Sequence, residues 1–314
     1  MKVYTPPTPF RALEIIRRFW GLPMTENPDE ADVLVPFVCP IGRQLVVVDS
    51  RNPSGSFPFE MLYEERKPVV PFLFASELSD VASVDFPFAG VFTYHPRIAS
   101  YLALGGVRVA LFPLGYDANR FYRTFAVVGS HRILTSGLTD VEAIRDVHAL
   151  LARRKETVVH IGVSIEELER WGDVRGIFTG GELPDSELSE AYRSVRYVWG
   201  GNVYGGFEMP ILEGAACGAI PICFDLPTYR YWFGGFARFL HHWRGRSLRA
   251  GSGVGSVRAK SLPEAEEALR MQSEMEALFR EESGVLADAE WLYESFSWDC
   301  VGRRYEAFLR EMGL

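Results

Sequence analysis

Short apolar runs recur along the first third of the chain, and stretches with helical periodicity lie between some of them. Runs rich in β-branched or aromatic residues predict buried strands at residues 31–37, 45–49, 90–94 and 107–112. Helical spacing of apolar residues predicts helices at 10–20 and 96–104. Strands that alternate with helices indicate a mostly parallel sheet with both faces covered.

The second half of the chain repeats this alternation more regularly. Strands are predicted at residues 125–129, 158–163, 174–180, 195–201 and 220–224. Helices are predicted at residues 140–152, 165–171 and 185–194. The fold class is therefore α/β, and 314 residues are comfortable for two such domains.

The segment YGGFEMPILEGAAC, residues 204–217, lies between two of these strands. Pro210 stands where a first helical residue belongs and Gly218 stands just past the end, which predicts a glycine loop followed by a short helix. Backbone N–H groups beside Gly205 and Gly206 would suit an anion such as a diphosphate. The carboxylates of Glu208 and Glu213 would accept hydrogen bonds from neutral sugar hydroxyls, and a nucleotide-sugar supplies both kinds of group.

Composition narrows the class of protein. Hydrophobic content of 47% and a net charge of −8 fit a globular protein that is not coated with nucleic acid. The sequence contains no D-x-D and no Cys/His spacing typical of zinc, so no metal is expected. The chain has no apolar run long enough for a membrane span, no signal-peptide pattern, and four cysteines that we expect to be reduced. These features predict a cytoplasmic protein.

The run GGFEMPILEGAACGAIPICFDLP resembles the signature of retaining GT-B glycosyltransferases, the group 1 family of glycogen-synthase and mannosyltransferase type. Its usual form is E-G-F-G-L-P-x-L-E-A-x-A-x-G-x-P-V, and the matching positions are Phe207, Pro210, Leu212, Glu213, Ala216, Gly218 and Pro221. Two positions depart, because Gly205 replaces the first Glu of the signature and Glu208 replaces its second Gly. FPLGYDANRF (112–121), FTGGELPDSELSEAYRSV (178–195) and SFSWDCVGRRYEAFLR (295–310) resemble further segments of that family.

The resemblance implies the GT-B architecture, in which two Rossmann-like parallel-sheet domains face a cleft and a C-terminal helix crosses back to the N-terminal domain. Residues 1–123 would then form an acceptor domain and residues 124–294 a nucleotide-sugar domain. Residues 295–314 would form the helix that packs back on the N-terminal domain.

The resemblance also implies site residues. Glu213 would bind the ribose hydroxyls of the donor, within a donor-binding set of Glu213, Gly205, Gly206, Phe207, Met209, Pro210 and Gly180. Glu208 is a catalytic candidate that would bind the donor sugar in place of the signature Glu, whose position Gly205 occupies. The alternative for Glu208 is a loop carboxylate without such a role.

The family places an Arg and a Lys after the first strand of its second domain, where their charges stabilise the leaving diphosphate. Ser130 and either Thr135 or Ser136 stand at those positions here. Arg132 and His131 are close enough in sequence to substitute as catalytic candidates. The alternative for Arg132 is an exposed charge or an ion-pair partner.

Residues 226–263 contain seven Arg or Lys and two His, with no Asp or Glu. Arg244 and Arg246 would form a lip that binds phosphate groups of the donor or of a polyanionic acceptor, and His95 would lie on the acceptor side. The alternative for this segment is a surface loop without such a role.

The sequence thus predicts a retaining, metal-independent glycosyltransferase that uses a UDP- or GDP-linked sugar and no cofactor. Two kinds of acceptor stay open, a hydroxymethylated base in phage-type DNA, or a glycan or protein. Two further alternatives are a non-catalytic nucleotide-sugar-binding protein and a 2-epimerase of the same architecture.

Overall fold

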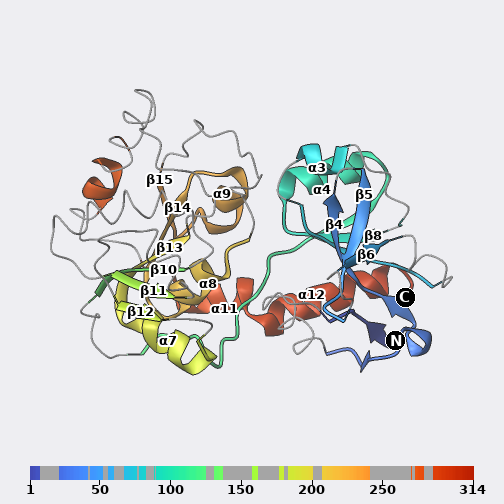
Figure 1. Cartoon of the computed structure of the whole chain (residues 1–314), viewed down its shortest axis with the longest axis horizontal. Coiled ribbons are helices and arrows are strands. Elements are labelled where there is room, and N and C mark those ends of the chain that lie inside the picture. The colour runs from blue at the N-terminus through green and yellow to red at the C-terminus, as the bar shows by residue number, and fades with distance from the viewer. Residues whose placement is uncertain are drawn as a thin grey trace. The chain divides into compact units, whose positions relative to one another are not determined.

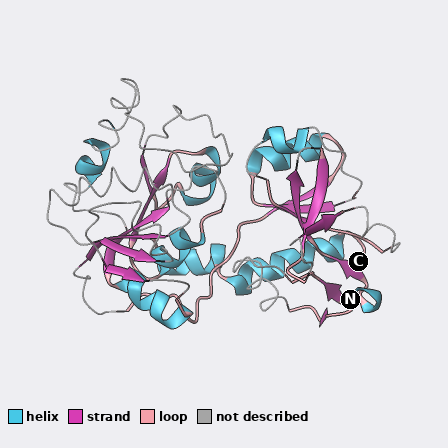
Figure 2. Ribbon diagram, viewed as in Figure 1, coloured by secondary structure: helices cyan, strands magenta, loops and turns pink. Residues whose placement is uncertain are grey.

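The computed structural model of the chain describes residues 1–7, 21–41, 43–51, 56–59, 67–75, 78–82, 88, 90–124, 131–136, 158–161, 177–179, 183–200, 207–240, 270, 273–278 and 286–314. These residues fall into two compact units. Unit 1 consists of Met1–Ala118, Tyr204–Met209 and Glu290–Leu314, and unit 2 consists of Asn119–Val203 and Pro210–Ala289. Each unit contains a six-stranded sheet with helices beside it (Figure 2).

Unit 1 contains a six-stranded sheet with the order β6-β5-β4-β7-β8-β9. These strands are β4 (Phe37–Ile41), β5 (Gln44–Val48), β6 (Ser56–Pro58), β7 (Phe72–Leu73), β8 (Gly90–Thr93) and β9 (Arg108–Leu111). β4, β7, β8 and β9 are parallel to one another, whereas β5 and β6 pair antiparallel. A second, parallel sheet has the order β2-β1-β3, with β1 (Val3–Tyr4), β2 (Met24–Thr25) and β3 (Val33–Leu34).

Alternation along the strands of unit 1 separates two apolar faces. Val38, Leu73 and Val91 pack in one core with Ile98 and Leu102 of helix α4 (Pro96–Leu104), beside α3 (Leu78–Ala82). Their strand neighbours Phe37, Phe72 and Phe92 point to the other face because successive side chains alternate, and their rings stack with centroids 4.7–5.0 Å apart.

That second face is covered by the last helix of the chain, α12 (Trp298–Glu311), which follows α11 (Ala289–Phe296). The ring of Tyr305 meets those of Phe72 and Phe92 edge-on at 5.2 and 5.0 Å, and its hydroxyl donates to the carbonyl of Pro113 at 2.8 Å. Figure 1 shows α12 running alongside the strands of unit 1, with both chain ends in the same unit.

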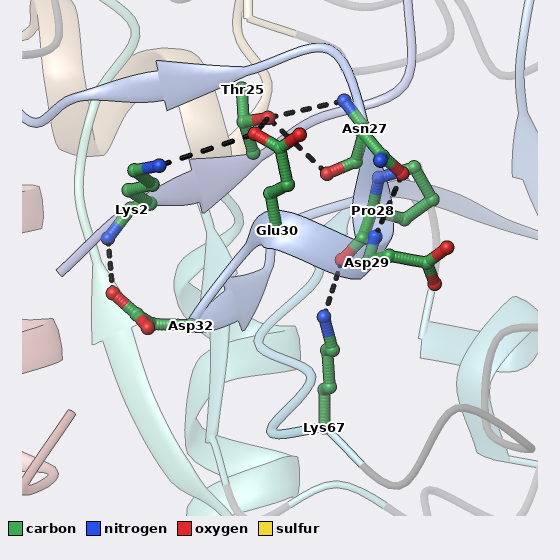
Figure 3. A network of polar contacts seen from close by, with 8 residues as sticks. All are labelled: Lys2, Thr25, Asn27, Pro28, Asp29, Glu30, Asp32 and Lys67. Atoms are coloured by element: carbon green, nitrogen blue, oxygen red, sulfur yellow. Dashed lines mark hydrogen bonds and ion pairs between the residues drawn. The ribbon is translucent and has the colours of Figure 1, made fainter.

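A polar network fixes the first turn of unit 1, around the 3-10 helix η1 (Pro28–Glu30). The backbone N–H of Lys2 donates to Asp32 at 2.5 Å, and the Nζ of Lys67 donates to the carbonyl of Pro28 at 2.6 Å (Figure 3). The side chain of Asn27 caps η1 by accepting from the N–H of Asp29. These contacts hold the small sheet together, although most of them are exposed and individually weak.

Unit 2 contains six parallel strands in the order β12-β11-β10-β13-β14-β15. The strands are β10 (His131–Ser136), β11 (Val158–Ile161), β12 (Ile177–Thr179), β13 (Val195–Gly200), β14 (Ile220–Phe224) and β15 (Arg238–Leu240). The described helices of the unit include α7 (Asp185–Arg193), α8 (Met209–Ala216) and α9 (Pro227–Phe233). Numbered within the unit, this order is 3-2-1-4-5-6, which is the order of doubly wound nucleotide-binding sheets.

Several elements differ from those predicted. The run at residues 31–37 is not one strand, because the chain breaks at Pro36 into β3 and β4. A strand at residues 131–136 was not predicted, and the predicted strand at 125–129 lies outside the described residues. By contacts, the divisions between the units fall after Ala118 and before Glu290, and residues 204–209 cluster with unit 1, while the domain boundaries at 123/124 and 294/295 stay a prediction.

Candidate functional site

The strand order of unit 2 places a candidate site at one point of its sheet. From β10 the chain continues outward to β11 and β12 on one side, and from β13 it continues to β14 and β15 on the other. In open parallel sheets the ligand site lies at the carboxyl ends of the strands where this reversal occurs. β13 ends there at Gly200, and the chain after it leads into α8.

Two glycines bring α8 close to β13. A Cβ atom on Gly200 would lie 2.5 Å from Cδ1 of Ile211, and one on Gly214 would lie 2.6 Å from Cγ1 of Val198. Gly218 adopts a φ of 94°, which a glycine tolerates and which ends the helix shortly after Ala216. The predicted short helix between Pro210 and Gly218 is therefore confirmed, although it begins one residue earlier, at Met209.

Glu213 lies in the middle of α8 with 1% of its surface exposed. The hydroxyl of Tyr192, at the end of α7, donates to Oε2 of Glu213 at 3.2 Å. A buried carboxylate is tolerated only when donors satisfy its oxygens, and Tyr192 supplies one. Since the carboxylate is almost fully covered, covering atoms must move before a ligand can reach it.

Glu208 belongs to unit 1 and lies beside the end of β8. The side chains of Phe207, Glu208 and Met209 are each 8% exposed. The ring of Phe207 packs edge-on against that of Tyr94, with the ring centroids 6.2 Å apart. Burial raises the pKa of Tyr94, with smaller contributions from Cys39 and Glu208. The Tyr94 phenol therefore keeps its proton at neutral pH and can act as a donor.

His95 follows Tyr94 and caps helix α4. Its Nδ1 accepts a hydrogen bond from the backbone N–H of Ile98 at 3.5 Å, and the backbone N–H of His95 donates to Thr93 Oγ1 at 3.2 Å. With Nδ1 used as an acceptor, a neutral ring carries its proton on Nε2. The side chain is 6% exposed, so His95 is primarily built into the strand–helix turn of unit 1.

Within unit 2, His131 and Arg132 do not lie at the carboxyl end of β13. Both residues lie at the start of β10, and His131 pairs with Val195, the first residue of β13. Gly200 lies five residues further along β13, a distance of about 17 Å at the rise of a strand. His131 and Arg132 thus lie at the opposite end of the parallel strands from Gly200. We therefore do not propose that they stabilise the charge of the diphosphate.

Thr135, one of the two residues that could stand at the family's lysine position, is fully buried in β10. Its hydroxyl forms a hydrogen bond with Nδ1 of His160 on the neighbouring strand β11, and His160 is also fully buried. This pair satisfies two polar groups inside the sheet of unit 2. Thr135 therefore has a structural role in the core of unit 2.

Five predicted site residues lie outside the described residues, namely Gly180, Gly205, Gly206, Arg244 and Arg246. Within the described ranges, no group of three or more His, Cys, Asp or Glu side chains could hold a metal ion. The same part of the chain contains no helix with the length and apolarity needed to span a bilayer. All four cysteines are free thiols.

Two aromatic residues near the candidate carboxylates were not singled out from sequence. Tyr192 lies 21 positions before Glu213, and Tyr94 lies 114 positions before Glu208. Tyr192 had a weak signal, because it falls on the tyrosine of the family-like stretch at 178–195. For Tyr94, the sequence offers no signal beyond its place at the end of a predicted strand.

Neither a protein-family model nor a curated protein sequence matches the chain. Solved structures do match. The pneumococcal O-GlcNAc transferase GtfA, in complex with UDP and GlcNAc, matches with a TM-score of 0.61 and 11% identity over 89% of this chain. The sucrose-phosphate synthase from Thermosynechococcus elongatus matches with a TM-score of 0.59 and 12% identity over the whole chain and 99% of its own length. The chain has the GT-B glycosyltransferase fold.

The GT-B fold was the one implied by the signature at residues 205–221, and this prediction is confirmed. A third match, in a GtfA/B complex, has a TM-score of 0.55 and 14% identity over 81% of this chain. The chain spans 55% of that GtfA/B chain and 56% of the pneumococcal chain. Identities of 11–14% support the GT-B fold and not a substrate.

Proposed function

We propose that the chain is a glycosyltransferase that moves a sugar from a UDP- or GDP-linked donor to an acceptor hydroxyl. The observation that carries this proposal is the position of Glu213, which α8 holds directly after the strand at the reversal point of the unit 2 sheet. Ligands of doubly wound sheets bind at this point. The GT-B fold supports the same class of reaction, since the matched structures include an O-GlcNAc transferase in complex with UDP.

The donor contacts follow from the chemistry of the side chains. A carboxylate accepts hydrogen bonds only, so Glu213 suits the two ribose hydroxyls of the nucleotide. The segment between β13 and α8 would offer backbone N–H groups of Gly205 and Gly206 to the diphosphate. Glu208 would accept hydrogen bonds from hydroxyls of the donor sugar, with Met209, Pro210 and Phe207 shaping that end.

The transfer would retain the configuration at the anomeric carbon. The bond from that carbon to the diphosphate oxygen breaks, a short-lived oxocarbenium-like state forms, and the acceptor oxygen bonds on the face that the diphosphate left. The acceptor proton passes to the departing phosphate oxygen, so no protein base is needed. We propose that the reaction needs no metal, and that backbone N–H groups together with Arg244 and Arg246 stabilise the leaving charge.

For the acceptor we propose a hydroxymethylated base in phage-type DNA. The support is the charge of residues 226–263, which contain seven basic residues and no acidic one in a chain whose net charge is −8. Such a segment attracts a polyanion locally. A glycan or protein acceptor is the alternative, and it predicts no salt-dependent affinity for DNA. The cytoplasm would be the site of either reaction.

A non-catalytic nucleotide-sugar-binding protein is the second candidate function. It is favoured by Gly205 in place of the first signature Glu and by Ser130 in place of the family Arg. A 2-epimerase of the same fold would release free nucleotide and an altered sugar. Incubation with a donor and no acceptor separates these hypotheses, because a transferase slowly releases free sugar and a pure binder releases none.

The test begins with a thermal-shift screen of UDP, GDP and their sugars, because a ligand that binds the folded state raises the apparent melting temperature. Glu213→Gln preserves size and should abolish the shift, whereas the control Glu190→Ala, an exposed acid on α7, should preserve it. A Glu213→Gln variant that binds and turns over like the wild type would overturn the site assignment. Equal, negligible retention on DNA of the wild type and an Arg244/Arg246/Arg249 triple alanine variant at low salt would remove DNA as acceptor.

A further inference from the structure

Tyr192 contacts the candidate ribose-binding carboxylate directly. It lies in the last turn of α7 with 2% of its surface exposed. Its hydroxyl donates to Oε2 of Glu213 at 3.2 Å. Both partners are buried, so this hydrogen bond is shielded from solvent and is stronger than an exposed one would be.

Recognition of a ribose diol requires a carboxylate with a fixed plane. Two neighbouring hydroxyls donate to the two oxygens of one carboxylate only when the group faces them edge-on. A glutamate has three rotatable side-chain bonds, and each adds an entropic cost if it must be fixed during binding. A donor already bound to Oε2 sets the rotation of the carboxylate beforehand. Each carboxylate oxygen accepts about two hydrogen bonds, so Oε2 can accept from Tyr192 and from a ligand together.

The ring of Tyr192 is itself held in place. It meets the ring of Phe121 at 6.0 Å and an interplanar angle of 67°, close to the preferred edge-to-face arrangement. Phe121 lies near the start of unit 2, which begins at Asn119. We call residues 119–123 the entry segment. The position of the Tyr192 hydroxyl thus depends on how firmly the entry segment is attached to α7.

Both ends of α7 bind the entry segment. At the start of the helix, Asp185 accepts from Nη1 of Arg120 at 2.7 Å. At its end, Arg193 donates to the carbonyls of Tyr122 and Arg120 at 3.1 and 3.2 Å, and its guanidinium lies 4.7 Å from the centre of the Tyr122 ring. These contacts fix Phe121 against Tyr192 from two sides.

From this chain of contacts we infer that Tyr192 is a positioning residue for nucleotide binding, which orients the Glu213 carboxylate toward the ribose hydroxyls of a nucleoside diphosphate. The inference rests on the proposed function, because it takes Glu213 as the ribose-binding group. It adds a residue that touches no substrate and acts only through Glu213. The entry segment then contributes to donor affinity through Phe121.

The test compares ribonucleotides with their 2′,3′-dideoxy counterparts. Dissociation constants of UDP, GDP and the two dideoxynucleoside diphosphates are measured by calorimetry for the wild type and for Tyr192→Phe, which removes one oxygen and keeps the ring. We expect Tyr192→Phe to weaken binding of the preferred ribonucleotide about tenfold, the typical effect of losing a hydrogen bond to a charged group. We expect no change for its dideoxy counterpart.

Tyr305→Phe is the matched control. It also removes the bonded hydroxyl of a buried tyrosine, but in unit 1, where the hydroxyl donates to Pro113. It should leave all four dissociation constants unchanged. If Tyr192→Phe proves unstable, Phe121→Leu keeps the hydroxyl but loosens the ring, and it should weaken ribonucleotide binding about two- to threefold with the dideoxy value unchanged.

The outcomes distinguish the positioning role of Tyr192 from the proposed function of the chain. If Tyr192→Phe weakens both ligands equally, or neither, the positioning role is overturned while the proposed function survives on the ribose preference of the wild type. If the wild type binds UDP or GDP no better than the dideoxy ligands, Glu213 does not read the ribose and the assignment beneath this inference fails. If the wild type binds no nucleoside diphosphate, both proposals fail.

Discussion

Replacing Gly214 by alanine probes the close approach of α8 to β13. The new Cβ would lie 2.6 Å from Cγ1 and 2.9 Å from Cβ of Val198, whereas carbon atoms in normal contact are about 3.5–4.0 Å apart. The helix would have to move by about 1 Å, or Val198 would have to leave its rotamer. Overpacking of this kind costs about 1–3 kcal/mol, and the better helix propensity of alanine offsets about 1 kcal/mol of it. We expect a net loss of up to about 2 kcal/mol.

A double-mutant cycle isolates the steric part of this loss. Val198 is fully buried, and Val198→Ala should cost about 2–3 kcal/mol through reduced burial and a residual cavity. In the double variant the methyl group introduced at position 214 fills space that the valine side chain vacated. The two losses should therefore fall short of additivity by about 1–2 kcal/mol.

Urea unfolding followed by circular dichroism measures these differences. The transition that belongs to unit 2 is the one that moves in Val198→Ala. Ala191→Gly on α7 calibrates the difference between glycine and alanine in a helix of the same unit. If Gly214→Ala stabilises unit 2 by about 1 kcal/mol, only helix propensity is acting and the close packing of α8 on β13 is refuted.

Three further predictions address other parts of the chain. Tyr305→Phe removes the 2.8 Å hydrogen bond to Pro113 and should destabilise unit 1 by about 1–2 kcal/mol in thermal unfolding, whereas Tyr101→Phe on the exposed side of α4 should have no effect; equal stability of both variants would contradict the bond. Arg193→Ala should speed amide hydrogen exchange of residues 120–123 about tenfold, measured by mass spectrometry, and unchanged exchange there would show that Arg193 does not hold the entry segment. Burial raises the pKa of Cys39 to about 11 and that of Cys217 to about 12, so at pH 8 the reactive thiolate is about one in a thousand molecules or fewer. Alkylation of both cysteines in the folded protein should therefore be slow at pH 8 and rise about tenfold per pH unit, whereas a rate equal to that of the urea-unfolded chain would contradict their burial.

Local signals predicted the segment around α8 well. Pro210 is a strong helix-start signal and Gly218 a strong helix-stop signal. The runs before and after them are apolar enough to be predicted as strands. The same kind of signal failed at β10. Its apolar residues, Ile133 and Leu134, are flanked by the polar residues His131, Arg132 and Ser136, so no strand was predicted at 131–136. The prediction therefore missed that His131 and Arg132 begin a strand.

Pairings across the chain could not be predicted from sequence. The contact of Phe207 with Tyr94 joins residues 113 positions apart, and it is decided by tertiary packing and not by local propensity. The bond of Tyr192 to Glu213 requires that α7 and α8 lie near one another, which strand order determines. Buried polar partners such as Thr135 and His160 look in sequence like ordinary polar positions until the register of two strands is known.

Unit 1 is assembled from three stretches of chain, and the last of them follows all of unit 2 in the sequence. Until Tyr305 and Phe308 leave the ribosome, the aromatic face formed by Phe72 and Phe92 has no α12 to cover it. Unit 1 thus begins to be translated before unit 2 but is completed after it. A nascent chain stalled before residue 298 should present this face to chaperones, and expression of residues 1–118 alone should give an aggregation-prone product.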